Sequence, residues 1–155
     1  MILSSHIITG AALGANFQNI YLMPTAAIAL HFFLDKIPHY DYTIKPFSFI
    51  VSAKVFADIG ISAITILIIY LFFNPNINPT YVIAGIFFSV LPDGFLLISF
   101  IFQNKWLQKY RQFHDFFHWQ SQKNPETNGE EKKIPTFWNL SAQLIVIIIA
   151  LYYLL

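Results

Sequence analysis

The sequence has no cysteine and few charged residues. Without cysteine, disulfide bonds and metal sites built on thiolates are excluded. Charged residues make up 11% of the 155 positions, whereas a typical soluble domain has about 25%. A soluble fold of this size could not cover its surface with so few charges. The net charge of +1 is too small to favour nucleic acid, whose binding depends on neutralising many phosphates.

Apolar and aromatic residues take the place of charge. Hydrophobic residues account for 56% of the chain and aromatic residues for 18%, and the mean hydropathy is +0.56. Most charged residues lie in 35–58 and 104–133, which leaves long uncharged runs elsewhere. Apolar runs of about 20 residues can cross a bilayer as helices. The sequence therefore predicts an all-α, polytopic helical membrane protein, with residues 1–155 as a single integral membrane domain.

Six helical segments are expected. The first four form two helical hairpins, with turns at 16–19 and 74–79. A polar, aromatic helix suited to the membrane interface follows, then a charged loop at 121–135 and a C-terminal spanning helix. The N-terminus lacks a positive n-region, so no removable signal peptide is expected. The helices are expected over about 3–15, 20–37, 46–73, 80–103, 104–120 and 136–155.

Glycine and proline predict two features within these helices. Gly10 and Gly14 lie four apart and would let another helix approach the first one closely. Pro92, followed by Asp93 and Gly94, should break the fourth helix and free backbone carbonyls. Such a break is tolerated at membrane depth only where it is buried in protein or lines a wet cavity.

Lysine and arginine predict the orientation in the membrane. The turns at 16–19 and 74–79 contain neither residue, whereas the opposite face receives nearly all of them. Cytoplasmic loops carry the excess of positive charge. We therefore expect an inner-membrane protein with a cytoplasmic N-terminus and an external C-terminus. The residues that set this bias are Lys36, Lys45, Lys105, Lys109, Arg111, Lys123, Lys132 and Lys133.

Residues 29–41 carry the clearest chemical signal. His31 and Asp35 lie four apart in an apolar helix, so both project from one face. A neutral imidazole and a carboxylate so placed suit a divalent transition metal such as zinc. Ionisable groups within membrane segments are costly and mark functional sites by default. His39 and Asp41 follow Pro38 and are expected at the cytoplasmic lip of the site.

Counting residues inward from the uncharged turns brings three carboxylates to one depth. At about 1.5 Å per helical residue, Asp35, Asp58 and Asp93 lie roughly 21–23 Å from the outer face. Unpaired carboxylates gathered there would repel one another, and a bound cation removes that difficulty. His114 and His118 repeat the four-residue spacing and could hold one metal ion from a single helical turn. The predicted ligands are His6, His31, Asp35, Asp93, His114 and His118, with Asp58 or Asp115 as general base.

Ordinary structural roles remain open for individual members of this set. His6 alone is more typical of an interfacial histidine. Lys54 and Asp58 have the spacing of a helical ion pair, and Asp93 could cap a helix that begins after Pro92. The paired histidines near residue 114 could face lipid headgroups. The sequence favours a shared site because the three carboxylates lie at one depth and all five histidines lie on or toward the cytoplasmic half.

Three motifs resemble a known family. They are Ser5-His6-x-x-x-Gly10-x-x-x-Gly14, Leu91-Pro92-Asp93 and the later histidine pair. Together they look like the bacterial and archaeal membrane-bound metal-dependent hydrolases, also called LexA-binding inner-membrane-associated hydrolases. The resemblance implies a small helical membrane protein, with His6, Asp93, His114 and His118 as candidates for the metal site.

A second, shorter resemblance covers about nine residues. The run from His31 through Asp35 to Pro38-His39 is similar to the His-x-x-x-Asp…Pro-x-His signature of zinc-dependent phospholipases C and related nucleases. In that family, the histidine and aspartate bind zinc within an all-helical fold. Both resemblances imply metal-assisted hydrolysis.

The residues and the resemblances lead to one hypothesis and two alternatives. The leading hypothesis is a membrane-embedded hydrolase that uses a divalent metal, with zinc favoured, on a lipid or lipid-linked phosphoester at the cytoplasmic leaflet. Membrane lipids are the expected partners, and the oligomeric state stays open. The first alternative is a metal- or proton-coupled transporter, in which the ionisable residues form the permeation path. The second is a non-enzymatic membrane protein with a structural metal.

Overall fold

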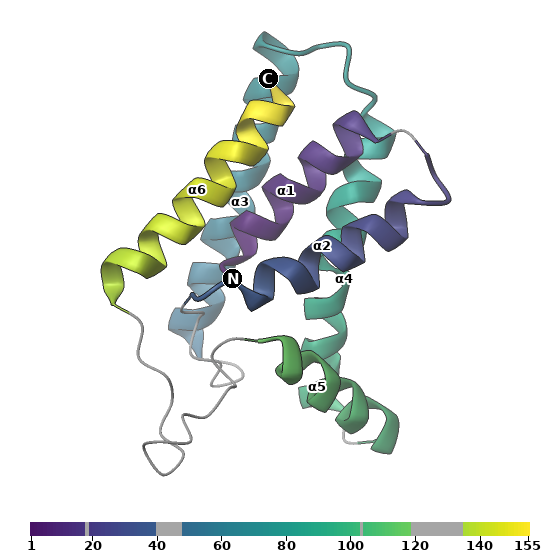
Figure 1. The fold of residues 1–155 in the computed structure, drawn as a ribbon, viewed down its shortest axis with the longest axis vertical. Helices are drawn as coiled ribbons and strands as arrows, with labels where there is room; N and C mark the ends of the chain where they lie inside the picture. Colours follow the sequence, from purple (N-terminus) through teal and green to yellow (C-terminus); the bar gives the residue numbers. More distant parts are fainter. Residues whose placement is uncertain (18, 40–47, 103, 119–134) are drawn as a thin grey trace.

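The computed structural model describes residues 1–155 except 18, 40–47, 103 and 119–134. The described residues form α-helices and no strand, which confirms the all-α prediction. The helices are α1 (Leu3–Asn16), α2 (Met23–Lys36), α3 (Phe49–Phe72), α4 (Pro79–Ile101), α5 (Lys105–Phe117) and α6 (Thr136–Leu154) (Figure 1).

Three of these helices, α3, α4 and α6, are long and apolar enough to cross a membrane. They leave many large apolar side chains exposed, among them Phe49 on α3, which is 87% exposed, and Tyr152 on α6, which is 76% exposed. A soluble monomer rarely exposes contiguous apolar surface on this scale. The exposed faces are those that a polytopic membrane protein turns toward lipid.

Helix α1 lies at the centre of the molecule and packs against α4, α6 and α3 (Figure 1). The predicted close approach is confirmed, and the partner helix is α4. A Cβ atom added at Gly10 would lie 2.7 Å from the carbonyl oxygen of Gly85. A Cβ atom at Gly14 would meet the Tyr81 backbone at a similarly forbidden distance. Both positions therefore need glycine for α1 to reach α4.

Helix α4 is continuous through Pro92, so the predicted break is wrong. Proline removes one backbone donor from a helix, and neighbouring groups can satisfy the backbone around it. The hydroxyl of Tyr110 donates a hydrogen bond to the carbonyl of Pro92 at 2.7 Å. The ring of His31 pairs with the carbonyl of Ser89 at 2.8 Å. Side chains from α5 and α2 thus support the proline-containing segment.

The other helices match their predicted bounds to about three residues. At the start of α2, which differs by three residues, the side chain of Asn19 accepts hydrogen bonds from the backbone N–H groups of Tyr21 and Leu22. This local turn delays the helix to Met23. The loop predicted at 121–135 lies outside the described residues except at its last position.

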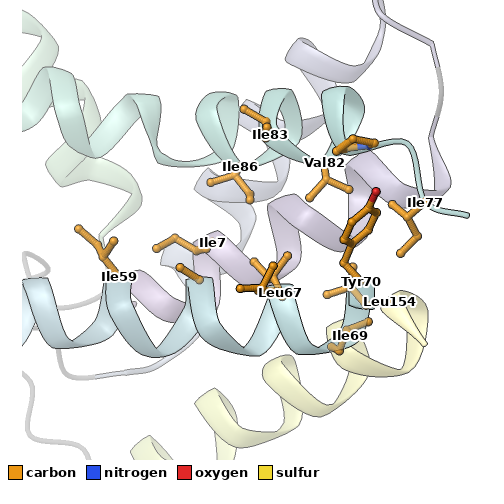
Figure 2. A pocket seen from close by; sticks show the side chains of 13 residues that line it. Ile7, Ile59, Leu67, Ile69, Tyr70, Ile77, Val82, Ile83, Ile86 and Leu154 are labelled. Carbon is orange, nitrogen blue, oxygen red and sulfur yellow. The ribbon is translucent and has the colours of Figure 1, made fainter. Parts of the chain in front are cut away.

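The two hairpins place their turns at the same end of the molecule as the C-terminus (Figure 1). The start of α1 and the end of α2 therefore come together near the middle of α4, where the end of α5 also arrives (Figure 1). An apolar groove of about 450 Å³ lies between α3 and α4, and Ile7 of α1 also lines it. Figure 2 shows Ile7 and Ile59 at one end of this groove and Ile77 at the other.

Candidate metal centre

Asp35 is the centre of a buried cluster of ionisable groups. Its side chain is fully buried. Oδ1 lies 3.1 Å from the N-terminal amine of Met1 and 3.2 Å from Nε2 of His6. Oδ2 lies 3.1 Å from Nε2 of His31, and 3.7 Å from Nε2 of both His114 and His118. One carboxylate thus brings together ring nitrogens from α1, α2, α5 and the residue that ends α5.

His31, Asp35, Asp93 and His114 form the first ligand set. Each offers one ligand atom, and these atoms lie within 4.8 Å of one another. Oδ1 of Asp93 is 3.7 Å from Nε2 of His31 and 3.4 Å from Nε2 of His114. Asp93 is the accessible member, with its side chain 30% exposed. The first ligand set therefore opens to the surface at Asp93.

The two histidines of the first ligand set point their Nε2 atoms at each other across 3.4 Å. Zinc–nitrogen bonds of 2.0–2.1 Å in a tetrahedral site place two nitrogens about 3.3–3.4 Å apart. Two imidazole nitrogens and two carboxylates are also ligands that zinc accepts. The donor types and the spacing between the nitrogens therefore fit a divalent metal ion.

Backbone contacts fix the tautomer and direction of His31. A carbonyl oxygen can only accept, so Nδ1 of His31 carries the proton and donates to Ser89 at 2.8 Å. In the neutral ring Nε2 then carries the lone pair, which a metal ion beside Asp35 could accept. The hydroxyl of Ser89 also donates to the carbonyl of His6 at 2.9 Å. Such outer contacts orient metal-binding histidines and set which nitrogen is available to the ion.

Asp35, His39 and His118 form the second ligand set, with ligand atoms again within 4.8 Å of one another. The expectation that His39 lies at the lip is wrong, because its side chain is fully buried. Ile37 has an extended backbone, and Nδ1 of His39 lies 2.5 Å from the carbonyl of Ile37. The chain after α2 therefore turns His39 inward. Asp41 lies outside the described residues.

His6 contacts both ligand sets without belonging to either one. Its ring stacks on that of His31, with centroids 4.3 Å apart and planes tilted by 31°. Nδ1 of His6 makes no hydrogen bond to a described residue, and Nε2 has its 3.2 Å contact with Asp35. Oδ2 of Asp35 also lacks a hydrogen bond within the described part of the chain, although three ring nitrogens surround it. Buried polar groups in this state are costly, and a cation among them would remove that cost.

The structure does not bring Asp58 and Asp115 into this cluster. Asp58 accepts a hydrogen bond from the backbone N–H of Ser4 at 3.4 Å, at the start of α1. Asp115 pairs with Arg111 along α5, with 3.9 Å between Oδ2 and Nε. Neither aspartate belongs to a ligand set formed by the described residues. Their contacts explain them as helix-end and surface groups.

Tyr110 closes one side of the centre from α5. Its hydroxyl donates to Pro92, and its ring packs near that of His114, with centroids 6.1 Å apart. Burial and the neighbouring carboxylates of Asp93 and Asp35 raise the pKa of Tyr110 above its ordinary value. Tyr110 therefore stays neutral and remains a donor through the physiological range.

Sequence reasoning missed two groups that help to build the centre. His39 carried a usable signal, because Pro38 before it predicts a change in chain direction. Ser89 carried none, since it contributes its backbone carbonyl to His31 and serine is common in membrane helices.

No family model, curated protein or solved structure matches this chain. The resemblances to hydrolase families therefore remain expectations. Function has to be inferred from the chemistry of the two ligand sets.

Proposed function

We propose that this chain is a membrane-embedded, metal-dependent hydrolase, whose first metal ion is held by His31, Asp35, Asp93 and His114. The observation that carries the proposal is the 3.4 Å separation of the Nε2 atoms of His31 and His114 beside two carboxylates. Zinc is the favoured ion, because it binds imidazole and carboxylate together in a tetrahedral arrangement.

A divalent ion bound there would polarise the scissile bond and lower the pKa of a coordinated water. The protein's own residues have separate tasks. Ser89 orients His31 through its backbone carbonyl. Tyr110 holds the backbone next to Asp93 through its bond to Pro92. The partial exposure of Asp93 supplies the side from which water and substrate reach the ion.

The apolar groove between α3 and α4 supports a lipid substrate. At about 450 Å³ it has the size of an ordinary ligand site. Its end at Ile7 lies near the centre, because Ile7 follows His6, which contacts Asp35 (Figure 2). A lipid tail in this groove would bring its headgroup to the start of α1. A lipid or lipid-linked phosphoester is the substrate class that we propose.

Helix α5 supports a place at the membrane surface. Trp106 is 83% exposed, and the ammonium of Lys109 lies 5.9 Å from the centre of its ring. Arg111 lies over the ring of Phe100 at 4.1 Å. Basic and aromatic side chains attract anionic headgroups at the interface. Together with the lysine bias of the sequence, this supports an inner-membrane protein whose N-terminus and α5 face the cytoplasm.

Metal analysis joined to a hydrolysis assay tests the proposal. The full chain, purified in detergent, should contain zinc in at least stoichiometric amount and cleave bis-p-nitrophenyl phosphate or phosphatidylglycerol in vesicles. Asp93→Asn should lower metal affinity at least about 10-fold and reduce cleavage in parallel. Asp115→Asn is the matched control and should change neither. A wild-type protein without stoichiometric metal would sink the proposal.

The rival transporter hypothesis predicts another result in the same preparation. Proteoliposomes would then carry zinc or protons across the bilayer, and the Asp93→Asn variant would lose this flux. Metal flux without cleavage of either phosphoester would favour transport over hydrolysis. Stoichiometric metal with neither flux nor cleavage would favour a structural ion.

A further inference from the structure

The two ligand sets share Asp35 and have parallel construction. Each takes one histidine from α2 or its immediate extension, which are His31 and His39. Each takes a second histidine from α5 or the residue after it, which are His114 and His118. The α2 side thus gives one imidazole to each set, and the α5 side does the same. The pattern describes two adjoining sites joined by one carboxylate.

The histidine rings of the two ligand sets lie next to each other around Asp35. The centroids of His114 and His118 are 5.3 Å apart, and their planes are tilted by 31°. Nε2 of His118 lies 3.7 Å from Oδ2 of Asp35. The rings of His39 and His118 have centroids 5.4 Å apart. His118 therefore contacts both Asp35 and His39, and it faces the same Asp35 oxygen as His31 does.

His31 in α2 and His39 just after it can offer the same ring nitrogen, Nε2, to a metal ion. Nδ1 of His31 donates to the carbonyl of Ser89, and Nδ1 of His39 donates to the carbonyl of Ile37. In each ring, Nε2 keeps the lone pair. A backbone carbonyl behind each ring fixes the tautomer that a metal ion needs. His39 thus meets the same requirement as His31, which the first ligand set already uses.

We propose that Asp35, His39 and His118 hold a second divalent metal ion, and that Asp35 bridges it to the first. The inference rests on the proposed function and assigns the centre to the two-metal class. Oδ2 of Asp35 faces histidines of both ligand sets, and one carboxylate oxygen can bridge two metal ions. Metal ions in such centres lie about 3.5–4 Å apart and stabilise the attacking and leaving oxygens of an in-line displacement.

The second site supplies a more open coordination position. The first ligand set offers four side chains, so a water on that ion would be a fifth ligand, whereas the second offers three. Zinc sites with three protein ligands keep a fourth position for water or substrate. In a phosphoester, the oxygen of that water forms a bond to phosphorus while the bond from phosphorus to the leaving oxygen breaks. One proton of the water ends on the leaving oxygen, and the other stays on or leaves the phosphate product.

The metal-to-protein ratio tests this proposal. The purified full chain, loaded with zinc and passed through a desalting column, should hold two ions. His39→Ala and His118→Ala should each hold one ion and retain the helical circular dichroism of wild type. Asp35→Ala should hold less than one, because it removes a ligand of both sites. His39→Gln should behave as His39→Ala, because glutamine keeps a polar side chain of similar size but lacks the imidazole nitrogen that would bind the ion.

Manganese loading adds a second measurement, which substitution of a histidine with only a structural role would leave unchanged. Two Mn²⁺ ions bridged by Asp35 should give an exchange-coupled electron paramagnetic resonance spectrum. His39→Ala should convert it to the spectrum of a single ion. One ion in wild type, with metal content and cleavage unchanged in His39→Ala, would overturn the two-metal proposal and leave the hydrolase proposal standing. A wild-type protein without any bound ion would overturn both.

Discussion

Nδ1 of His31 donates its proton to the backbone carbonyl of Ser89 over 2.8 Å, so a ligand on α2 is oriented by the main chain of α4. The same serine donates its hydroxyl proton to the carbonyl of His6 on α1. Ser89 thereby links α4 to both α2 and α1 through hydrogen bonds. The geometry of the centre depends on helix packing as much as on the ligands themselves.

Removing the proposed metal ion should destabilise the fold. The histidines of the centre and Asp35 are buried, and Oδ2 of Asp35 makes no hydrogen bond within the described residues. An ion bound only to the folded state stabilises that state by mass action. At a free ion concentration about 100 times Kd, the stabilisation is about 2.7 kcal/mol. Treatment with EDTA should therefore lower the thermal midpoint of wild type, measured by circular dichroism in detergent. The midpoint of Asp35→Ala should not respond, and an equal fall in both proteins would contradict the prediction.

Replacing the glycines where α1 meets α4 should be costly. The Cβ atom of Gly10→Ala would lie 2.7 Å from the carbonyl oxygen of Gly85, which must move. Overpacking of this kind costs typically about 1–3 kcal/mol. Gly60 and Gly94 are matched controls, because a Cβ atom there meets nothing within 4 Å.

Alanine at either control position should be neutral or stabilising by up to about 1 kcal/mol. Thermal unfolding of the four variants, Gly10→Ala, Gly85→Ala, Gly60→Ala and Gly94→Ala, gives the comparison. If Gly10→Ala melts with its controls, α1 and α4 do not meet as described.

Tyr110 should titrate later than an ordinary tyrosine. Burial and the nearby carboxylates raise the pKa of its hydroxyl in the folded protein. The proton is therefore held more tightly in the folded state, and the resulting stability is present at neutral pH and is lost as pH rises through the raised pKa. Absorbance of phenolate near 295 nm should show one late step in wild type that is missing in Tyr110→Phe. An unchanged titration curve in this variant would contradict the assignment.

Filling the apolar groove should separate lipid substrates from soluble ones. Ile86→Trp places a larger ring among the side chains that line the groove, which include Ile7 and Ile83 (Figure 2). Cleavage of phosphatidylglycerol in vesicles should fall several-fold, whereas cleavage of bis-p-nitrophenyl phosphate should not change. Ile148→Trp is the control, because Ile148 is exposed on α6 and does not line the groove. Equal effects on both substrates would argue against a bound lipid tail.

Hydropathy and helical spacing were sufficient to predict the helices and part of the site. The four-residue spacings of His31 with Asp35, and of His114 with His118, depend only on local helix geometry. The depth count correctly placed Asp35 and Asp93 at one level, where each contacts His31.

Tertiary contacts decided what the sequence alone could not. Pro92 was expected to break α4, but Tyr110 and His31 support the carbonyls around it. His39 was expected at the lip because it follows the helix, and the extended backbone at Ile37 instead turns it inward. Asp58 makes a hydrogen bond to the start of α1 and joins neither ligand set of the described residues. Depth along one helix does not determine which neighbour its side chain faces.

Helices α1 and α2 have 14 residues each, and a helix of that length extends about 21 Å. The hydrocarbon core of a bilayer is about 30 Å thick, so neither helix can cross it. The lengths of α1 and α2 thus determine the depth in the membrane at which His6, His31 and Asp35 lie. An additional turn inserted before His31 would carry that ring about 5.4 Å further along the axis, past its partners on α4 and α5. An insertion or deletion in this hairpin should therefore disturb the centre more than a substitution of a lipid-facing side chain.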